Sequence, residues 1–508
     1  MSEYVLIDCN RIQEYVFASS RLREICKASL LLDWIETKKI PEIAENYGAE
    51  VIRSGGGVNL IKTNNGNAET LHNEIITIFK KYGIEVTSIN KSISNSGSFY
   101  KDILSPLFKE ICGKKDRPEK KIVLPSTIIA VPCEASGSSP AEYVISTPHG
   151  EKKYCFSSAA KSYFKKRESE VEVWLKKEFK CFDIPDDLGG IVSWSKRGGD
   201  FEKEPGTSER RLLGVIYADV NGLGSLTEKI AKDESTYSKF SNGLRDAIKC
   251  SVFDALFMVI GKAINNRRQF PSNKALPVRV LYIGGDDLAL AVQGCFALDV
   301  TSEILRSFEK HSQELLKKTG LQNDIQGLTM SAGVVIAPHK YPFFSFNRLG
   351  KELEQRAKSA GRLNRLNNIP KSYIDFCLVK NNAIGGLNEI LAKVDLRLLS
   401  GGPYTLDEVS SLEKAVENLL EKEFPMNKLK KLVSILSSPS RRRLYKIWWE
   451  RLEEDQQKVF EKEAINRFNL EGEDVPLWRN NPLGLNSTPV VDIIDLITLI
   501  KVRRRGGE

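Results

Sequence analysis

One order of predicted strands and helices occurs twice in this chain of 508 residues, and the repeat restricts the fold more than any other feature. Each copy reads as strand, helical region, two strands joined by a glycine turn, helix and strand. The first copy is expected at residues 4–9, 12–17, 22–35, 50–53, 58–61, 69–82 and 84–89, and the second at 212–219, 225–266, 278–283, 288–292, 300–318 and 328–336. A repeated β-α-β-β-α-β order predicts an α+β protein with two ferredoxin-like domains.

The surrounding segments complete the predicted organisation. The polar stretch at 195–211 lacks apolar periodicity and is typical of a linker. A helix at 346–360 and a strand at 373–379 extend the second copy, and helix formers dominate beyond residue 382. The expected parts are a first ferredoxin-like domain, a short helical linker region, a second ferredoxin-like domain and a helical C-terminal domain, at 1–135, 136–210, 211–381 and 382–508.

Composition excludes several classes of protein. The nine cysteines include no Cys-x-x-Cys pair, which argues against a disulfide framework and a structural zinc and favours a reducing cytoplasm. The four histidines lack the spacing of a metal site, so any metal is expected to be held by carboxylates. The apolar stretches are too short or too interrupted for a membrane span of roughly 20 residues. With 75 Lys and Arg against 66 Asp and Glu, the net charge of +9 permits contact with nucleic acid.

The glycine turn of the second copy carries two carboxylates. Gly284 and Gly285 join two apolar strands, and Asp286 and Asp287 follow at once. Because glycine allows the positive φ angles of a tight turn, both carboxylates are expected at the tip of a hairpin. Taken alone, these residues fit an ordinary hairpin with solvated aspartates equally well.

A second polar feature follows the first strand of the same copy. Asp219 ends an apolar run, and a turn from Val220 to Gly224 leads into a helix. Backbone N–H groups at such a turn suit a triphosphate. By itself, Asp219 is as well explained as the start of a turn or the cap of the helix.

The predicted fold brings the two features together. In a ferredoxin-like sheet the first strand lies beside the hairpin strands, so Asp219 is expected to face Asp286 and Asp287. Three carboxylates at one place repel each other unless divalent cations such as Mg²⁺ or Mn²⁺ neutralise them. Two ions about 3.5 to 4 Å apart would align a hydroxyl, an α-phosphate and a pyrophosphate leaving group. This arrangement is typical of palm-type nucleotidyltransferases.

These residues resemble a known family, the large subunit of type III CRISPR effector complexes, which makes cyclic oligoadenylate from ATP. The resemblance rests on the residues at 218–224, the Gly-Gly-Asp-Asp turn at 284–287, TMSAGVVIAPHKYP at 329–342, the helix end at 356–358 and IQEYVFASSRLREICKASLLL at 12–32. It touches both copies and implies two palm, or nucleotide-cyclase, domains. The implied activity is transfer of nucleotides from ATP into cyclic oligoadenylate or a related AMP-containing messenger, with pyrophosphate release, in antiviral defence.

Carried over by position, the resemblance gives roles to individual residues. The catalytic residues would be Asp219, Asp286 and Asp287, which would also bind two Mg²⁺ or Mn²⁺ ions together with the backbone carbonyl of Val220. The ATP-binding residues of the second palm would be Asn221, Gly222, Leu223, Gly284, Gly285, Ser331 and Lys358. Ser331 would place a hydroxyl near the nucleotide, and Lys358 would place a positive charge on the triphosphate. Without the motif match, Ser331 also fits a core strand and Lys358 a solvated helix.

The glycine turn of the first copy contains no carboxylate. It consists of Ser54, Gly55, Gly56 and Gly57. The resemblance implies that it holds the acceptor nucleotide, whose 3′-hydroxyl attacks ATP in the second palm. A bulky side chain at Gly56 is then expected to block the acceptor without disturbing the metals. A flexible hairpin at a domain interface is the alternative.

The chain departs from the family pattern in three respects. Asn221 stands where the family has a second acidic residue, which leaves three aspartates in place of four. The His-Asp pair of the family's N-terminal nuclease domain is missing, so DNA cleavage is not expected. The family's cysteine zinc site is missing as well.

Charge and aromatic clusters suggest partners. The basic clusters at 114–121, 165–167, 441–443 and 503–505 are candidates for contact with RNA or protein. Trp448 and Trp449 beside one of them are interpreted as a partner surface. The family implies other subunits of an RNA-guided complex and guide or target RNA as partners.

Two other functions remain open. One is a structural large subunit whose palm is vestigial, which Asn221 allows and the intact Asp286 and Asp287 oppose. The other is a dinucleotide cyclase that uses GTP, whose Gly-Gly-Asp-Glu-Phe turn has a phenylalanine where this chain has Leu288.

Overall fold

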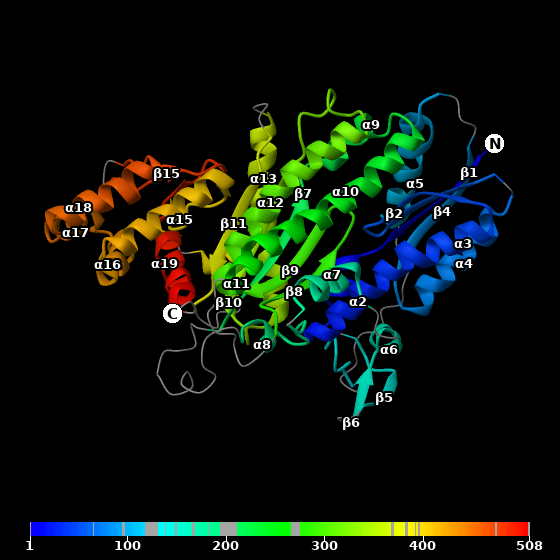
Figure 1. The fold of residues 1–508 in the computed structure, drawn as a ribbon, viewed down its shortest axis with the longest axis horizontal. Coiled ribbons are helices and arrows are strands. Elements are labelled where there is room, and N and C mark those ends of the chain that lie inside the picture. Colours follow the sequence, from blue (N-terminus) through cyan, green and yellow to red (C-terminus); the bar gives the residue numbers. More distant parts are fainter. Residues whose placement is uncertain are drawn as a thin grey trace.

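The computed structural model contains two related α+β domains that share an interface (Figure 1). It describes residues 2–64, 66–93, 97–116, 131–137, 139–147, 150–164, 168–180, 182–193, 211–265, 275–366, 370–380, 385–391, 393–394, 397–472 and 475–505. The linker expected at 195–211 lies outside these residues, except for its last position. None of the described helices is long and apolar enough to cross a membrane.

The first palm is a four-stranded antiparallel sheet in the order β2-β3-β1-β4. Its elements are β1 (Ser2–Cys9), α1 (Ile12–Val16), α2 (Leu22–Trp34), α3 (Ile40–Asn46), β2 (Glu50–Gly55), β3 (Val58–Thr63), α4 (Ala68–Lys81), β4 (Val86–Ile93) and α5 (Ser105–Lys115). The predicted element order is confirmed, but β4 starts later than the expected residue 84. The N–H of Ile84 donates to the carbonyl of Phe79 after Gly83 at φ 66°, so Ile84 closes the preceding helix.

The second palm has six strands in the order β14-β11-β10-β7-β9-β8. Its strands are β7 (Leu212–Val220), β8 (Val278–Ile283), β9 (Asp287–Gln293), β10 (Met330–Pro338), β11 (Tyr373–Leu378) and β14 (Tyr404–Thr405). Its helices are α9 (Leu223–Ile230), α10 (Glu234–Ala255), α11 (Lys262–Asn265), α12 (Ala297–Lys318) and α13 (Phe343–Leu366). Within this six-stranded sheet, β10 and β11 pair in parallel and the other described pairs are antiparallel.

Alternation along β7 divides its side chains between two cores. Ile216 and Ala218 pack with the cluster that contains residues of α10 and α12. Val215 and Tyr217 pack with the cluster that contains Leu353 of α13. Because successive strand residues face opposite sides of a sheet, Asp219 belongs to the face that α13 covers.

Each palm packs one of its helices against a strand of the other palm. Helix α10 of the second palm contacts β2 of the first, and α2 of the first contacts β8 of the second. Each helix therefore packs against a strand of the other palm's glycine hairpin. This reciprocal packing brings the two hairpins together.

The region between the palms differs from the purely helical prediction. It contains α6 (Phe156–Tyr163), α7 (Glu170–Glu178) and α8 (Leu188–Ile191), and also an antiparallel pair, β5 (Tyr143–Thr147) and β6 (Gly150–Tyr154). Val144, Ile145 and Thr147 are β-branched and suit a strand. Gly150 has a φ of 104°, which fits the turn into β6.

The C-terminal region is mainly helical, as expected. Its helices are α14 (Leu387–Ile390), α15 (Leu406–Glu421), α16 (Met426–Leu436), α17 (Arg441–Glu450), α18 (Glu454–Phe460) and α19 (Val490–Arg505). A small sheet in the order β12-β13-β16-β15 was not predicted. Its strands are β12 (Lys393–Val394), β13 (Arg397–Leu398), β15 (Arg479–Asn480) and β16 (Asn486–Ser487).

Candidate active site between the palms

The end of β7 and the start of β9 place two aspartates opposite each other. Asp219 and Asp287 are register partners in the antiparallel ladder. Directly opposite residues of such a ladder have neighbouring side chains on one face of the sheet. The Asp286 carbonyl accepts a hydrogen bond from the N–H of Val220 at 3.0 Å, which ties the hairpin tip to the end of β7. The sheet therefore brings all three predicted carboxylates to the same end of two neighbouring strands, β7 and β9.

Gly284 shapes the hairpin beside these carboxylates. Its N–H donates to the carbonyl of Asp287 at 2.7 Å. A Cβ at Gly284 would overlap Oδ1 of Asp287 and the hydroxyl of Tyr282. The absence of a side chain at this position is thus a condition for the observed position of the Asp287 carboxylate.

Gly284→Ala is therefore expected to reduce the predicted nucleotide transfer by about tenfold or more while the protein remains folded, because the added methyl group displaces the Asp287 side chain. Product formation and circular dichroism are the measurements. Gly327→Ala is the control, since a Cβ at Gly327 would meet no described atom within 4 Å. Equal activity of the two variants would contradict the assigned role of the hairpin.

Helix α13 contributes a charged pair to the same face. Lys358 Nζ lies 2.6 Å from Oδ2 of Asp219 and 3.6 Å from Oε1 of Glu354. Lys358 therefore points toward the aspartates and is not a solvated helix lysine. Sequence reasoning missed Glu354, although its position four residues before Lys358 on one helix puts both on the same face.

The crowded carboxylates alter each other's ionisation. Burial raises the pKa of Asp219 to about 7, and the charge of Asp286 adds to the rise while Lys358 opposes it. Burial and Asp286 raise the pKa of Asp287 to about 6 against hydrogen bonds from Gln13 and Tyr282. Burial also raises the pKa of Glu354. Carboxylates whose anionic forms are disfavoured in this way gain from a bound cation.

The donor chemistry of this edge fits Mg²⁺ or Mn²⁺, because carboxylate oxygens are the ligands that these ions prefer. Lys358 already places one cation against Asp219. In the described part of the chain, no group of three or more His, Cys, Asp or Glu side chains is arranged to hold a metal ion. Metal binding by Asp219, Val220, Asp286 and Asp287 therefore stays a prediction.

Asn221 and Ser331 are buried and form a hydrogen bond with each other. The Ser331 hydroxyl is fully buried and donates to Oδ1 of Asn221 at 2.8 Å. The Asn221 amide donates to Oγ1 of Thr329 at 3.0 Å. These bonds join the end of β7 to β10, so the expectation of a Ser331 hydroxyl at the nucleotide is not supported. The Asn221 side chain takes part in both of these hydrogen bonds, and its backbone begins the turn that leads to α9.

The turn after β7 leads into α9 as expected. Gly222 has a φ of 68° and caps the helix, a conformation that favours glycine. Leu223 lies beside Gly224 in the lining of a pocket described below. Phosphate binding by the amides of this turn stays a prediction.

The first-palm hairpin touches the second-palm hairpin directly. A Cβ at Gly56 would lie 2.7 Å from the backbone N of Gly285. The Gly57 N–H donates to the buried carboxylate of Glu36 at 2.7 Å, and Ser54 Oγ lies 2.7 Å from the Glu36 carbonyl oxygen. A side chain at Gly56 would therefore push against the hairpin that carries Asp286 and Asp287, so its effect would not be confined to an acceptor nucleotide as the sequence led us to expect.

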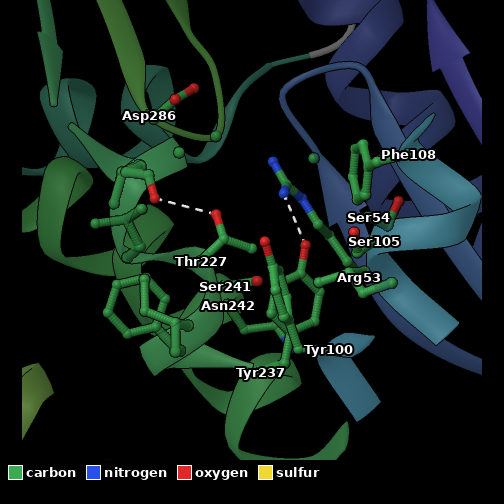
Figure 2. A pocket seen from close by; sticks show the side chains of 18 of the residues that line it. Arg53, Ser54, Tyr100, Ser105, Phe108, Thr227, Tyr237, Ser241, Asn242 and Asp286 are labelled. Carbon is green, nitrogen blue, oxygen red and sulfur yellow. Dashed lines mark hydrogen bonds between the residues drawn. The ribbon is translucent and has the colours of Figure 1, made fainter. Parts of the chain in front are cut away.

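A pocket of about 750 Å³ opens beside both hairpins (Figure 2). Its volume lies in the range of small-molecule sites. Figure 2 shows Arg53 and Ser54 reaching it from the first palm and Tyr237, Ser241 and Asn242 from α10. The remaining lining includes Gly55, Tyr100, Leu104, Ser105, Phe108, Lys109, Leu223, Gly224, Thr227, Phe240, Arg245, Gly285 and Asp286.

Aromatic and basic side chains give the pocket its character. Arg53 donates to the Tyr237 hydroxyl at 2.9 Å across the two palms. Tyr100, Phe108 and Phe240 supply apolar walls. Aromatic faces suit a nucleobase and arginine suits phosphate. Sequence reasoning missed Arg53 and Tyr237, which lie 184 residues apart and carry no local motif.

The predicted partner surface at the tryptophans is wrong for Trp448. This residue is 4% exposed, and its indole N–H donates to the Lys428 carbonyl at 3.0 Å. Tyr445 and Phe460 pack against it, so Trp448 belongs to the core of the C-terminal region. Arg442 and Arg443 on the same helix are exposed. The clusters at 165–167 and 117–121 lie outside the described residues, as do the side chains at 503–505.

Comparisons with known proteins agree with this architecture. Residues 212–367 match the family model for the second palm domain of Cas10/Cmr2. No curated protein matches the sequence significantly.

Solved structures share the fold across the whole chain. The chain is similar to one from the Csm1-Csm4 cassette in complex with cA4, with 15% identity and a TM-score of 0.55 over 100% of this chain and 70% of that one. For the cassette in complex with pppApA the values are 16% and 0.55 over 99% and 69%. For Csm1 in T. onnurineus they are 14% and 0.53 over 99% and 69%. The predicted α+β palm fold with a helical C-terminal region is confirmed.

Proposed function

We propose that the chain is a large subunit of a type III CRISPR effector complex and a metal-dependent nucleotidyltransferase; the match of residues 212–367 to the second palm domain of Cas10/Cmr2 and the shared fold support this proposal. Its substrate is ATP, and its product is cyclic oligoadenylate or a related AMP-containing messenger, with pyrophosphate released. It acts in antiviral defence in the cytoplasm, together with other subunits of the complex and guide or target RNA.

One observation carries this proposal. Asp219 and Asp287 lie opposite each other beside Asp286, at the point where the catalytic hairpin borders a pocket built by both palms. An enzyme that links two nucleotides needs an acceptor site next to the groups that activate the α-phosphate. The two hairpins in contact supply such a pair of neighbouring sites.

The residues of the two palms divide the work. Asp219, Asp286 and Asp287 hold the divalent ions, which when bound neutralise the phosphates and activate the 3′-hydroxyl. Lys358 binds the triphosphate as a point charge. The aromatic wall of the pocket stacks the acceptor base, and Arg53 lies within the same pocket as a partner for its phosphates. Positioning and charge neutralisation account for catalysis in such transfers.

The test is chromatography of products after incubation with each of the four NTPs and Mg²⁺ or Mn²⁺, with and without candidate activator RNA. Adenylate products from ATP alone are expected. Product from GTP alone would favour the dinucleotide cyclase. No product under any condition, with the effector complex assembled, would favour a vestigial palm in a structural subunit.

Metal affinity is expected to depend on pH. Asp219 and Asp287 must lose their protons to bind a cation, and their pKa values are raised to about 7 and about 6. Mn²⁺ affinity measured by calorimetry without nucleotide should therefore rise about tenfold from pH 6 to pH 7.5. Asp219→Asn should reduce this rise to about twofold.

Stability in the absence of metal should change in the opposite direction. The folded protein retains protons on these carboxylates at pH values where the unfolded chain has released them. Its free energy of unfolding should therefore fall as pH rises from about 4 to about 7. For the preceding prediction, a Mn²⁺ affinity that does not change with pH would contradict the assignment of Asp219.

A further inference from the structure

Helix α1 lies where the first palm, the second palm and the region between them meet. Its Ile12 side chain fills the space that a Cβ of Gly57 would need, next to the first-palm hairpin. Phe17 at its end packs edge-on against Tyr217 of β7, with ring centroids 5.9 Å apart. These two contacts, together with a third from the region between the palms, position this short helix.

The region between the palms supplies the third contact. The buried Lys161 of α6 donates to the Tyr15 carbonyl at 2.6 Å, and its Nζ lies 3.7 Å from the centre of the Tyr15 ring. Burial lowers the pKa of Lys161 to about 8. A buried ammonium with a carbonyl and an aromatic face as partners holds α1 firmly.

Gln13 of this helix reaches across the interface to a catalytic carboxylate. Its Nε2 donates to Oδ2 of Asp287 at 2.8 Å, over a separation of 274 residues. A carboxylate only accepts hydrogen bonds, so the amide nitrogen of Gln13 must face it. The Tyr282 hydroxyl is a second hydrogen-bond partner of the same carboxylate. Gln13 is therefore the donor to Asp287 that comes from the other palm.

We propose that Gln13 is a positioning residue that makes the metal-binding geometry of Asp287 depend on the docking of the first palm; this inference rests on the proposed function. Gln13 and Tyr282 each use one acceptor position of the Asp287 carboxylate, and its other lone pairs stay available to a cation. Hydrogen-bond partners of metal ligands orient those ligands, and their loss typically weakens metal binding 10- to 100-fold.

This arrangement links the two palms through one side chain. The carboxylate set of the second palm is correctly oriented only when α1 is seated between Gly57, Tyr217 and Lys161. Movement of the first palm relative to the second changes the orientation of Asp287 through Gln13. The metal affinity therefore depends on whether the first palm is docked against the second.

The experiment measures Mn²⁺ affinity of the full chain by calorimetry without nucleotide. Gln13→Met keeps the length and loses the donor, and Gln13→Asn keeps the amide but is one methylene short. Both should bind Mn²⁺ about 10- to 100-fold more weakly. Glu14→Gln is the matched control on the same helix, because Glu14 is exposed and pairs with Arg11 at the surface. It should match the wild type.

A kinetic measurement separates positioning from a general loss of structure. In both Gln13 variants the apparent KM for Mn²⁺ should rise, while the KM for ATP at saturating Mn²⁺ stays within about twofold of the wild type. Wild-type Mn²⁺ affinity in Gln13→Met, with affinity lost in Asp287→Asn, would overturn this inference alone. Wild-type affinity in Asp287→Asn would overturn the proposed metal site and the inference with it.

Discussion

The double variant Asp286→Asn with Asp287→Asn is expected to form no detectable linked nucleotide. Both changes keep the size of the side chain and remove the charge that holds divalent ions. Loss of metal-based stabilisation of the transition state costs several kcal/mol, and roughly 4 kcal/mol corresponds to about a thousandfold in rate. Product chromatography with ATP and Mn²⁺ at pH 8 measures the effect.

The same variant should not lose stability. Asp286 raises the pKa values of both Asp219 and Asp287, so the three charges repel each other in the folded protein. Neutralising two of them relieves that repulsion, and the melting temperature should stay equal or rise. Asp324→Asn is the control, since Asp324 lies in the same domain and pairs with Lys232 at the surface. Wild-type product from the double variant would refute the site.

Local patterns in the sequence were sufficient to predict the core of the site. The β-α-β-β-α-β order and the Gly284-Gly285 turn predict that β7 lies beside the hairpin. That neighbourhood predicts that Asp219 faces Asp286 and Asp287, and the strand register confirms that Asp219 is opposite Asp287. These inferences hold because strand periodicity and turn chemistry act over a few residues.

Contacts between distant segments could not be predicted in this way. Gln13 meets Asp287, and Arg53 meets Tyr237, only because the palms dock against each other. No periodicity within either segment carries information about its partner. The β5 and β6 hairpin was missed for a related reason, since a short alternating run is ambiguous without its pairing strand.

The sequence also could not predict where individual side chains point. Asn221 and Ser331 sit at positions that the motif associates with the nucleotide, yet they bond to each other beneath the sheet edge. A position in a motif defines the backbone location but not which neighbours a side chain finds. Lys358 shows the opposite case, because its position on α13 alone directs it to Asp219.

Lys358→Met is expected to change the affinities for ATP and for metal in opposite directions. Without nucleotide, Lys358 is a counter-ion of Asp219 at 2.6 Å and competes with a cation for that carboxylate. Its removal should tighten Mn²⁺ binding where Asp219 is ionised. Because Lys358 lowers the pKa of Asp219, which is about 7 in the wild type, the variant must be compared at a higher pH than the wild type requires. ATP affinity should fall by about 1.5 to 3 kcal/mol, roughly 10- to 150-fold, because a charge-assisted phosphate contact is lost.

Calorimetric titrations with Mn²⁺ alone and with ATP alone measure the two effects separately. Lys310→Met on the exposed side of α12 is the control for the loss of one positive charge from the domain, and it should alter neither affinity. Unchanged ATP affinity in Lys358→Met would mean that this lysine only neutralises Asp219. A parallel loss of both affinities would mean that Lys358 maintains the fold of the sheet edge. Opposite changes identify Lys358 as the group that exchanges Asp219 for the triphosphate when metal and nucleotide bind.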